Sequence, residues 1–267
     1  MNETKVDYLN GKLFPMILKF SIPAAVSLLI TAVYNIVDRM FVGNFNGTSA
    51  LAGLSVCFPL SYMMMAFALM CSAGGSTFFS LFSGQNEPEK MNQSFGNAMV
   101  LVCVSEIILS ALLLVFPDPI LKAFGVTGTA YPYAILYYRI VAFGCVFQGL
   151  SQLFCDFVRV SGKPVLGMCV TGIGAVTNVI LDAVFIIIFD WGVTGAASAT
   201  VIGQIISCGF AFWAAQMAMG FISLVYNSQL GKYGGDIAIS DLLATALSIL
   251  LVLKEKKRMM FHSALQI

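Results

Sequence analysis

Six long apolar segments constrain the fold of this chain more than any other feature. A helix needs about 20 apolar residues to cross the hydrocarbon core of a bilayer. Runs of that size lie at about 15–42, 51–83, 95–116, 131–157, 165–189 and 194–218. Because the backbone of a segment in lipid must satisfy its own hydrogen bonds, the sequence predicts an all-α integral membrane protein with a six-transmembrane-helix bundle.

The composition also indicates a lipid surrounding and argues against nucleic acid as a partner. Hydrophobic residues make up 59% of the chain and charged residues 10%, whereas soluble domains carry roughly 25% charged residues. The formal net charge is +1, and the chain has no basic tract of the size that nucleic acid binding requires. Membrane lipid is therefore the expected surrounding, and nucleic acid is not an expected partner.

The basic residues between the apolar segments predict the orientation. With a cytoplasmic N-terminus, the cytoplasmic segments hold Lys5, Lys12, Lys19, Lys90, Arg159 and Lys163, and the opposite side holds only Lys122 and Arg39. Lysine and arginine concentrate in cytoplasmic loops. We therefore expect a multi-pass protein of the cell membrane with its N-terminus inside.

A partial internal repeat predicts that the chain contains one complete lobe and the start of a second one. The tripeptide "VYN" occurs at 33–35 and again at 225–227, and "VGNFNGTSALA" (42–52) resembles "LGKYGGDIAIS" (230–240). Parallel repeats of whole bundles occur in transporters. Residues 1–218 are thus expected to form one six-helix lobe, and 219–267 a truncated or rearranged start of a second one. The topology of this last region stays open between a re-entrant segment and a single span.

A buried acid marks the end of the first apolar segment. Asp38 shares a helix face with Tyr34 and Asn35. Ionisable groups at membrane depth are costly and commonly mark a pathway or a site. Two interpretations remain open here: Asp38 belongs to a binding site lined by Tyr34 and Asn35, or it pairs with Arg39 and faces lipid headgroups.

A second acid lies in the fifth segment. Asp182 follows Asn178 by one helical turn, and Thr200 lies six residues into the sixth segment. In the predicted topology these three residues and Asp38 share one depth layer in the outer half of the membrane. The alternative for the fifth segment is a structural contact in which Asn178 donates to Asp182.

The residue types of this layer indicate a cation. Carboxylate, amide and hydroxyl oxygens suit a proton or a hard ion such as Na⁺ better than a transition metal. Two neighbouring carboxylates also titrate as a coupled pair. The sequence therefore predicts a cation-coupling site at Asp38, Asn178, Asp182 and Thr200, with Na⁺ or H⁺ as coupling ion and no other cofactor.

Three further residues stand out within the apolar segments. Glu106 lies in the middle of the third segment and Arg139 in the fourth, where the two side chains could approach each other along a substrate route. Pro23 removes a backbone hydrogen bond inside the first segment. It is expected to bend that helix and to act as a hinge.

These residues resemble the MATE family (multidrug and toxic compound extrusion) of cation-coupled efflux transporters. The resemblance rests on "SIPAAVSLLITAVYNIVDRMFVG", "GQNEPEKMNQSFGNA", "TNVILDAVFI" and "GAASATVIGQ", and "VYNSQLGKYGGDIAI" resembles the end of the family's seventh helix. It implies two six-helix lobes around a cleft that exports cationic or amphipathic drug-like compounds in exchange for Na⁺ or H⁺. It also implies an amino-lobe cation site at Asp38, Asn178, Asp182 and Thr200, lined by Tyr34, with Pro23 as the family's bend.

Several other functions compete with an antiporter. After "GGDIAIS" the resemblance fades, so the chain could be a non-transporting membrane remnant, or could pair with a second copy to complete a cleft. A lipid-linked flippase of the same superfamily would need basic residues in its cavity, where Arg139 is nearly alone. An intramembrane aspartyl protease needs two carboxylates that share a water, but the contexts "IVDR" and "ILDA" do not match its motifs. No enzyme activity is therefore expected.

Overall fold

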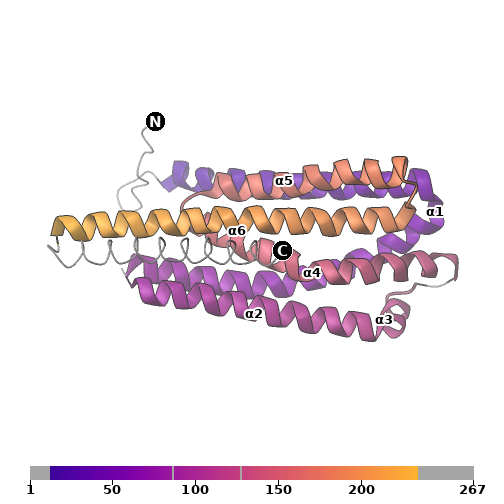
Figure 1. The fold of residues 1–267 in the computed structure, drawn as a ribbon, viewed down its shortest axis with the longest axis horizontal. Helices are drawn as coiled ribbons and strands as arrows, with labels where there is room; N and C mark the ends of the chain where they lie inside the picture. The colour runs from indigo at the N-terminus through magenta and orange to yellow at the C-terminus, as the bar shows by residue number, and fades with distance from the viewer. Residues whose placement is uncertain (1–12, 86, 127, 234–267) are drawn as a thin grey trace, which may run out of the picture. The chain divides into compact units, whose positions relative to one another are not determined.

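The regular structure is helical throughout the part of the chain that the structure describes. This computed structural model describes residues 13–85, 87–126 and 128–233 (Figure 1). In chain order its elements are α1 (Leu13–Gly84), α2 (Pro88–Val115), α3 (Pro117–Ala123), the 3-10 turn η1 (Gly128–Ala130), α4 (Tyr131–Val160), α5 (Pro164–Asp182), the π-helical turn η2 (Ala183–Ile188) and α6 (Gly192–Tyr233). The predicted all-α class is confirmed.

The first two predicted spans are both contained in α1. Gly47 interrupts this element with φ 82° and ψ 178°, a conformation that glycine adopts without a Cβ clash. The chain reverses direction within α1, as Figure 1 shows at its right-hand side. Between the apolar segments 15–42 and 51–83, helix continues up to Gly47 and resumes directly after it.

Five elements of the described residues are long and apolar enough to cross a membrane, and α1 supplies two crossings. The six predicted spans are therefore all present. The third begins earlier than the sequence indicated: α2 starts at Pro88 rather than at 95. Proline is favoured in the first turn of a helix because the missing N–H would have no partner there, and this start turns the polar stretch before 95 into helix.

The exterior of these helices is apolar, whereas several of their polar side chains are buried. Leu28, Met70 and Phe143 are between 65% and 69% exposed, while Glu106 and Asn178 are almost fully buried. Water would favour the opposite distribution, but lipid favours this one. The chain is a multi-pass membrane protein.

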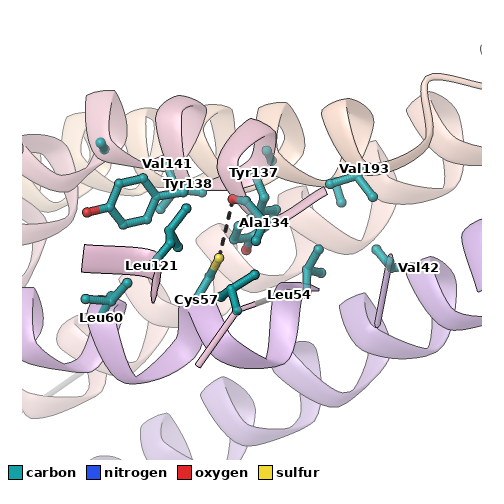
Figure 2. Close-up of a cluster of buried hydrophobic side chains, with 14 of the residues drawn as sticks. Val42, Leu54, Cys57, Leu60, Leu121, Ala134, Tyr137, Tyr138, Val141 and Val193 are labelled. Atoms are coloured by element: carbon teal, nitrogen blue, oxygen red, sulfur yellow. Dashed lines mark hydrogen bonds between the residues drawn. The ribbon is translucent and has the colours of Figure 1, made fainter. Parts of the chain in front are cut away.

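An apolar cluster holds the second half of α1 against α4. Leu54, Cys57 and Leu60 of α1 pack on Ala134 and Tyr138 of α4 (Figure 2). The Cys57 thiol donates to the Ala134 carbonyl at 3.6 Å. Helices α2 and α5 also contact α1 and α4, and all four of these helices carry predicted site residues.

The chain divides into two compact units, Met1–Gln216 and Met217–Ile267. Helix α6 runs from the first unit into the second and ends at Tyr233. Residues 234–267, which contain the end of the second copy of the repeat, lie outside the described residues. The division into a lobe at 1–218 and a partial second lobe at 219–267 stays a prediction.

Candidate functional site

A cavity of about 170 Å³ lies inside the first unit, between residues of α1, α4, α5 and α6. We call it the central cavity. Five of the predicted site residues line it: Tyr34, Asn35, Asp38, Asn178 and Thr200. The rest of its lining is Thr31, Phe58, Ser61, Tyr62, Met65, Tyr137, Val141, Gln148, Ser151, Gln152, Cys155, Thr171, Gly174, Ala175, Gly203, Gln204 and Ser207.

Asp38 is the one acidic or basic side chain in that lining. It is 3% exposed, and its Oδ1 atom has no hydrogen-bond partner among the described residues. The neighbouring Arg39 guanidinium instead lies over the Phe58 ring, 3.7 Å from its centroid. The alternative in which Asp38 faces headgroups and pairs with Arg39 is therefore wrong.

Asn178 contacts α6 rather than its own helix. Its Nδ2 atom donates to Thr200 Oγ1 at 3.3 Å, and the Thr200 hydroxyl donates to the Ala196 carbonyl at 3.0 Å. This arrangement contradicts the alternative in which Asn178 donates to Asp182. It leaves Asn178 Oδ1 without a partner in the described part of the chain.

Two glycines allow this contact between α5 and α6. A Cβ atom on Gly203 would lie 3.2 Å from the Gly174 carbonyl oxygen and 3.4 Å from Asn178 Cβ. Small residues at such positions let transmembrane helices approach closely. The Gly174–Gly203 contact thus brings the Asn178 amide within reach of Thr200.

Asp182 is fully buried and is not part of the cavity lining. Both of its carboxyl oxygens lack hydrogen-bond partners among the described residues, and it lies close enough to Asp38 for their charges to interact. Asp182 is the last residue of α5, and η2 follows it directly. Single π-helical turns are rare in proteins, and those that occur often lie at functional sites. Nothing in the sequence indicated this one.

The free oxygens of this group fit a hard cation. Asp38 Oδ1, Asn178 Oδ1 and both oxygens of Asp182 are buried acceptors without donors, and buried acceptors of this kind are stabilised by a proton or a metal ion. Residues 13–85, 87–126 and 128–233 contain no group of three or more His, Cys, Asp and Glu side chains that could hold a metal. Carboxylate and amide oxygens are hard donors of the kind that bind Na⁺ or H⁺.

The proposed hinge residue lies well before this group on α1. The Ser27 hydroxyl donates to the Pro23 carbonyl at 2.8 Å. Gly47 is the residue of α1 that departs from helical dihedral angles, so Pro23 does not interrupt the helix here. A bend at Pro23 stays a prediction about a second conformation.

Glu106 and Arg139 are not brought together. Glu106 is 1% exposed on α2 and does not line the central cavity. Arg139 is exposed on α4, and both Glu106 carboxyl oxygens lack hydrogen-bond partners in the described residues. The expected approach of these two side chains is wrong, and their place on a substrate route stays a prediction.

Several lining residues were missed by the sequence analysis. Gln204 Nε2 donates to Gln148 Oε1 at 3.2 Å, and Gln152 Nε2 donates to both oxygens of Asp156 at 3.1 Å. The pattern could have been found, because Gln148, Gln152 and Asp156 recur at intervals of four in an apolar run. That interval places polar groups on one face of a helix.

The geometry defines a membrane-embedded helical bundle with one acidic group in a polar interior cavity. The chain belongs to the MatE family, whose model matches residues 23–184. It is similar to the multidrug export protein MepA of Staphylococcus haemolyticus, with 26% identity over 74% of this chain and 44% of that protein. It is also 23% identical to MepA of Staphylococcus saprophyticus over 75% of this chain and 44% of that one. The chain therefore spans less than half the length of these relatives.

Solved structures share the fold. One is described as an outward-facing conformation of a multidrug resistance MATE family transporter of the MOP superfamily; it has a TM-score of 0.69 and 25% identity, over 74% of this chain and 44% of that one. A structure of MATE in the bent conformation gives a TM-score of 0.71 at 24% identity, over 76% of this chain and 45% of that one. A MOP superfamily transporter from Pyrococcus furiosus gives 0.69 at 20% identity, over 88% and 59%.

Proposed function

We propose that this chain takes part in the cation-coupled efflux of cationic or amphipathic drug-like compounds across the cell membrane, as a transporter and not as an enzyme. The central cavity carries this proposal, because the charge of its lining comes from Asp38 alone. The tyrosines 34, 62 and 137 add aromatic rings to that lining. A carboxylate attracts cations, and aromatic faces bind organic cations in particular.

Coupling follows if the ion and the drug compete for the same carboxylate. Na⁺ or H⁺ at Asp38, Asn178, Asp182 and Thr200 neutralises the charge that would hold a cationic drug in the cavity. Two ligands that bind one group exclusively, and that favour different conformations, produce exchange. Pro23 is the proposed hinge for this change, and the N-terminus is proposed to be cytoplasmic.

The relatives are longer than this chain, which raises the question of what forms the wall opposite the central cavity. The described bundle corresponds to somewhat less than half of the proteins it matches. We propose that a second copy of this chain can supply the opposite wall of the cleft. Cross-linking of the protein in its native membrane, followed by mass measurement, tests for that pair.

Efflux from cells tests the main proposal. Cells that express this chain are loaded with ethidium or norfloxacin, and efflux is followed with and without an imposed Na⁺ or pH gradient. We expect gradient-dependent efflux that Asp38→Asn removes and that Glu89→Gln, a change at an exposed acid of α2, leaves intact. Gradient-independent loss of the drug, equal to that of cells without the protein, would instead support a non-transporting remnant.

A lipid-linked flippase is the second candidate from the same fold. The Pyrococcus structure is described as having a binding pocket of reverse polarity that suggests a different function. The central cavity here has no Lys or Arg among its described lining residues, and an anionic lipid phosphate needs such cations. This polarity favours the cationic substrate.

A further inference from the structure

A second, smaller cavity surrounds the buried acid of α2. It has a volume of about 30 Å³ and is lined by Met64, Met65, Ala68, Glu106, Cys145, Gln148, Gly149 and Gln152. We call it the Glu106 cavity. Glu106 is 1% exposed, and neither of its carboxyl oxygens has a hydrogen-bond partner in the described part of the chain. The predicted coupling residues Asp38 and Asp182 are not in its lining.

The facing helix is shaped to accept this side chain. A Cβ atom on Gly149 of α4 would lie 2.8 Å from Glu106 Cγ, so any larger residue at 149 would displace the glutamate. One turn earlier on α4, the Cys145 thiol donates to the Glu106 backbone carbonyl at 3.5 Å. Glu106 is thus held against α4 by a close backbone approach and not by an ion pair.

The Glu106 cavity adjoins the central cavity. Met65, Gln148 and Gln152 line both of them. Gln148 Oε1 accepts from Gln204 Nε2, which leaves the Gln148 amide nitrogen available to a group on the other side. A volume of about 30 Å³ between a carboxyl and two amides is large enough and polar enough for a water molecule.

The charges around Glu106 decide its state. From α1 it faces Met64, Met65 and Ala68, and from α4 the one titratable group in the lining is the Cys145 thiol. No lysine or arginine lines this cavity among the described residues. An ionised carboxylate that has no cation beside it is disfavoured in such surroundings, so a bound proton would stabilise Glu106.

We propose that Glu106 is a second proton-binding carboxyl of this protein, and that it exchanges its proton with the central cavity through the passage between Gln148 and Gln152. The proton moves between a water in this passage and a Glu106 carboxyl oxygen, so the carboxylate becomes a neutral carboxylic acid and no other bond changes. This site is separate from the coupling residues Asp38 and Asp182, and it does not depend on which drug is transported.

Infrared spectroscopy of the purified full chain in detergent tests the bound proton. A neutral carboxylic acid gives a C=O stretching band that a carboxylate lacks. We expect Glu106→Gln, which keeps the shape of the side chain, to remove one such band at neutral pH. The matched variant Glu89→Gln, at an exposed acid of the same helix, should leave the protonated-acid bands unchanged. An unchanged set of protonated-acid bands in Glu106→Gln would overturn the proposal.

Deuterium exchange tests the route. The Glu106 band shifts when its proton is replaced by deuterium, and the rate of that shift reports access to water. Gln148→Leu should slow the shift several-fold, with Gln152→Met as a second variant, whereas Glu89→Gln should not change it. Equal rates in the Gln148 and Gln152 variants and the wild type would exclude this passage. Both measurements need neither a drug nor a gradient, so they can fail or succeed independently of the efflux experiment.

Discussion

The acids of the first unit differ in whether their carboxyl oxygens have hydrogen-bond partners. Asp156 accepts hydrogen bonds from Ser72 at 2.5 Å, from Gln152 at 3.1 Å and from Arg159 at 2.8 Å. Asp38 and Asp182 have carboxyl oxygens without any partner among the described residues. Asp156 therefore has its hydrogen-bond partners within the protein, whereas Asp38 and Asp182 keep free carboxyl oxygens in the described part of the chain.

We propose that this difference separates a structural acid, Asp156, from two binding acids, Asp38 and Asp182. A buried charge with complete partners holds helices together, and a buried acid with open oxygens is stabilised only when a ligand or a proton arrives. Sequences depart from full satisfaction of polar groups mainly at functional sites. Substitutions at Asp156, Asp38 and Asp182 should therefore have different effects.

The largest expected effect is the loss of the cation response in Asp182→Asn. Asp182 directly precedes η2, whose Phe185 ring lies 5.0 Å from the Trp191 ring and whose Phe185 carbonyl accepts from the Trp191 backbone N–H at 2.9 Å. Na⁺ or H⁺ at Asp182 should therefore change Trp191 fluorescence. The chain has two tryptophans, so the titration is done in a Trp213→Phe background.

Asp156→Asn is the matched control for this titration. It changes an acid whose partners are already complete, so its Trp191 response should equal that of the parent protein. If Asp182→Asn also responds like the parent, Asp182 is not part of the coupling site.

The second largest effect is expected on stability, where substitution of Asp156 should cost more than substitution of Asp38. Asp156→Ala removes the acceptor of three donors and leaves Arg159 without its ion pair. We expect the free energy of unfolding to fall by about 2 kcal/mol. The loss is no larger because the ion pair is partly exposed. Asp38→Asn removes no hydrogen bond at Oδ1 and should leave stability unchanged or raised in Na⁺-free buffer. Unfolding in detergent measures both, and an equal loss in the two variants would contradict the contrast.

The sequence predicted the spans and the residues near the cavity because both depend on composition and on helical period. It did not predict the partners. Arg39 follows Asp38 directly, but successive residues on a helix point about 100° apart, and Arg39 lies over Phe58 instead. Asn178 and Asp182 do share a face, yet Thr200 on another helix takes the Asn178 donor.

The remaining differences have the same origin. The break at Gly47, the π-helical turn η2 and the separation of Glu106 from Arg139 depend on how neighbouring helices pack. A periodic pattern shows which face of a helix is buried, but not the register between two helices. The polar row Gln148, Gln152 and Asp156 was visible in the sequence, and its role depends on Ser72 and Gln204 from other helices.

A smaller effect is expected from the close contact of α5 and α6. The valine of Gly203→Val would press on the Gly174 carbonyl and on Asn178 Cβ, so it should move the Asn178 amide and weaken the Na⁺ or H⁺ response of Trp191 by about 10-fold, with about 1–3 kcal/mol of overpacking. Gly209→Val on the same helix meets no atom within 4 Å and should have neither effect. Matching losses in the two variants would show that the contact does not position Asn178.

The smallest effect is expected at Thr200. Thr200→Val keeps the shape of the side chain but removes the acceptor for Asn178 Nδ2, a loss of about 1 kcal/mol and about 5-fold in cation affinity. Thr200→Ser keeps the hydroxyl and should bind like the parent protein in the same Trp191 titration. If Thr200→Val binds equally well, the hydroxyl neither orients Asn178 nor ligates the ion, and the cation site reduces to Asp38, Asp182 and Asn178. A loss of affinity in Thr200→Ser equal to that in Thr200→Val would show that loss of the hydroxyl alone does not explain the effect, since Thr200→Ser keeps the hydroxyl and removes only the methyl.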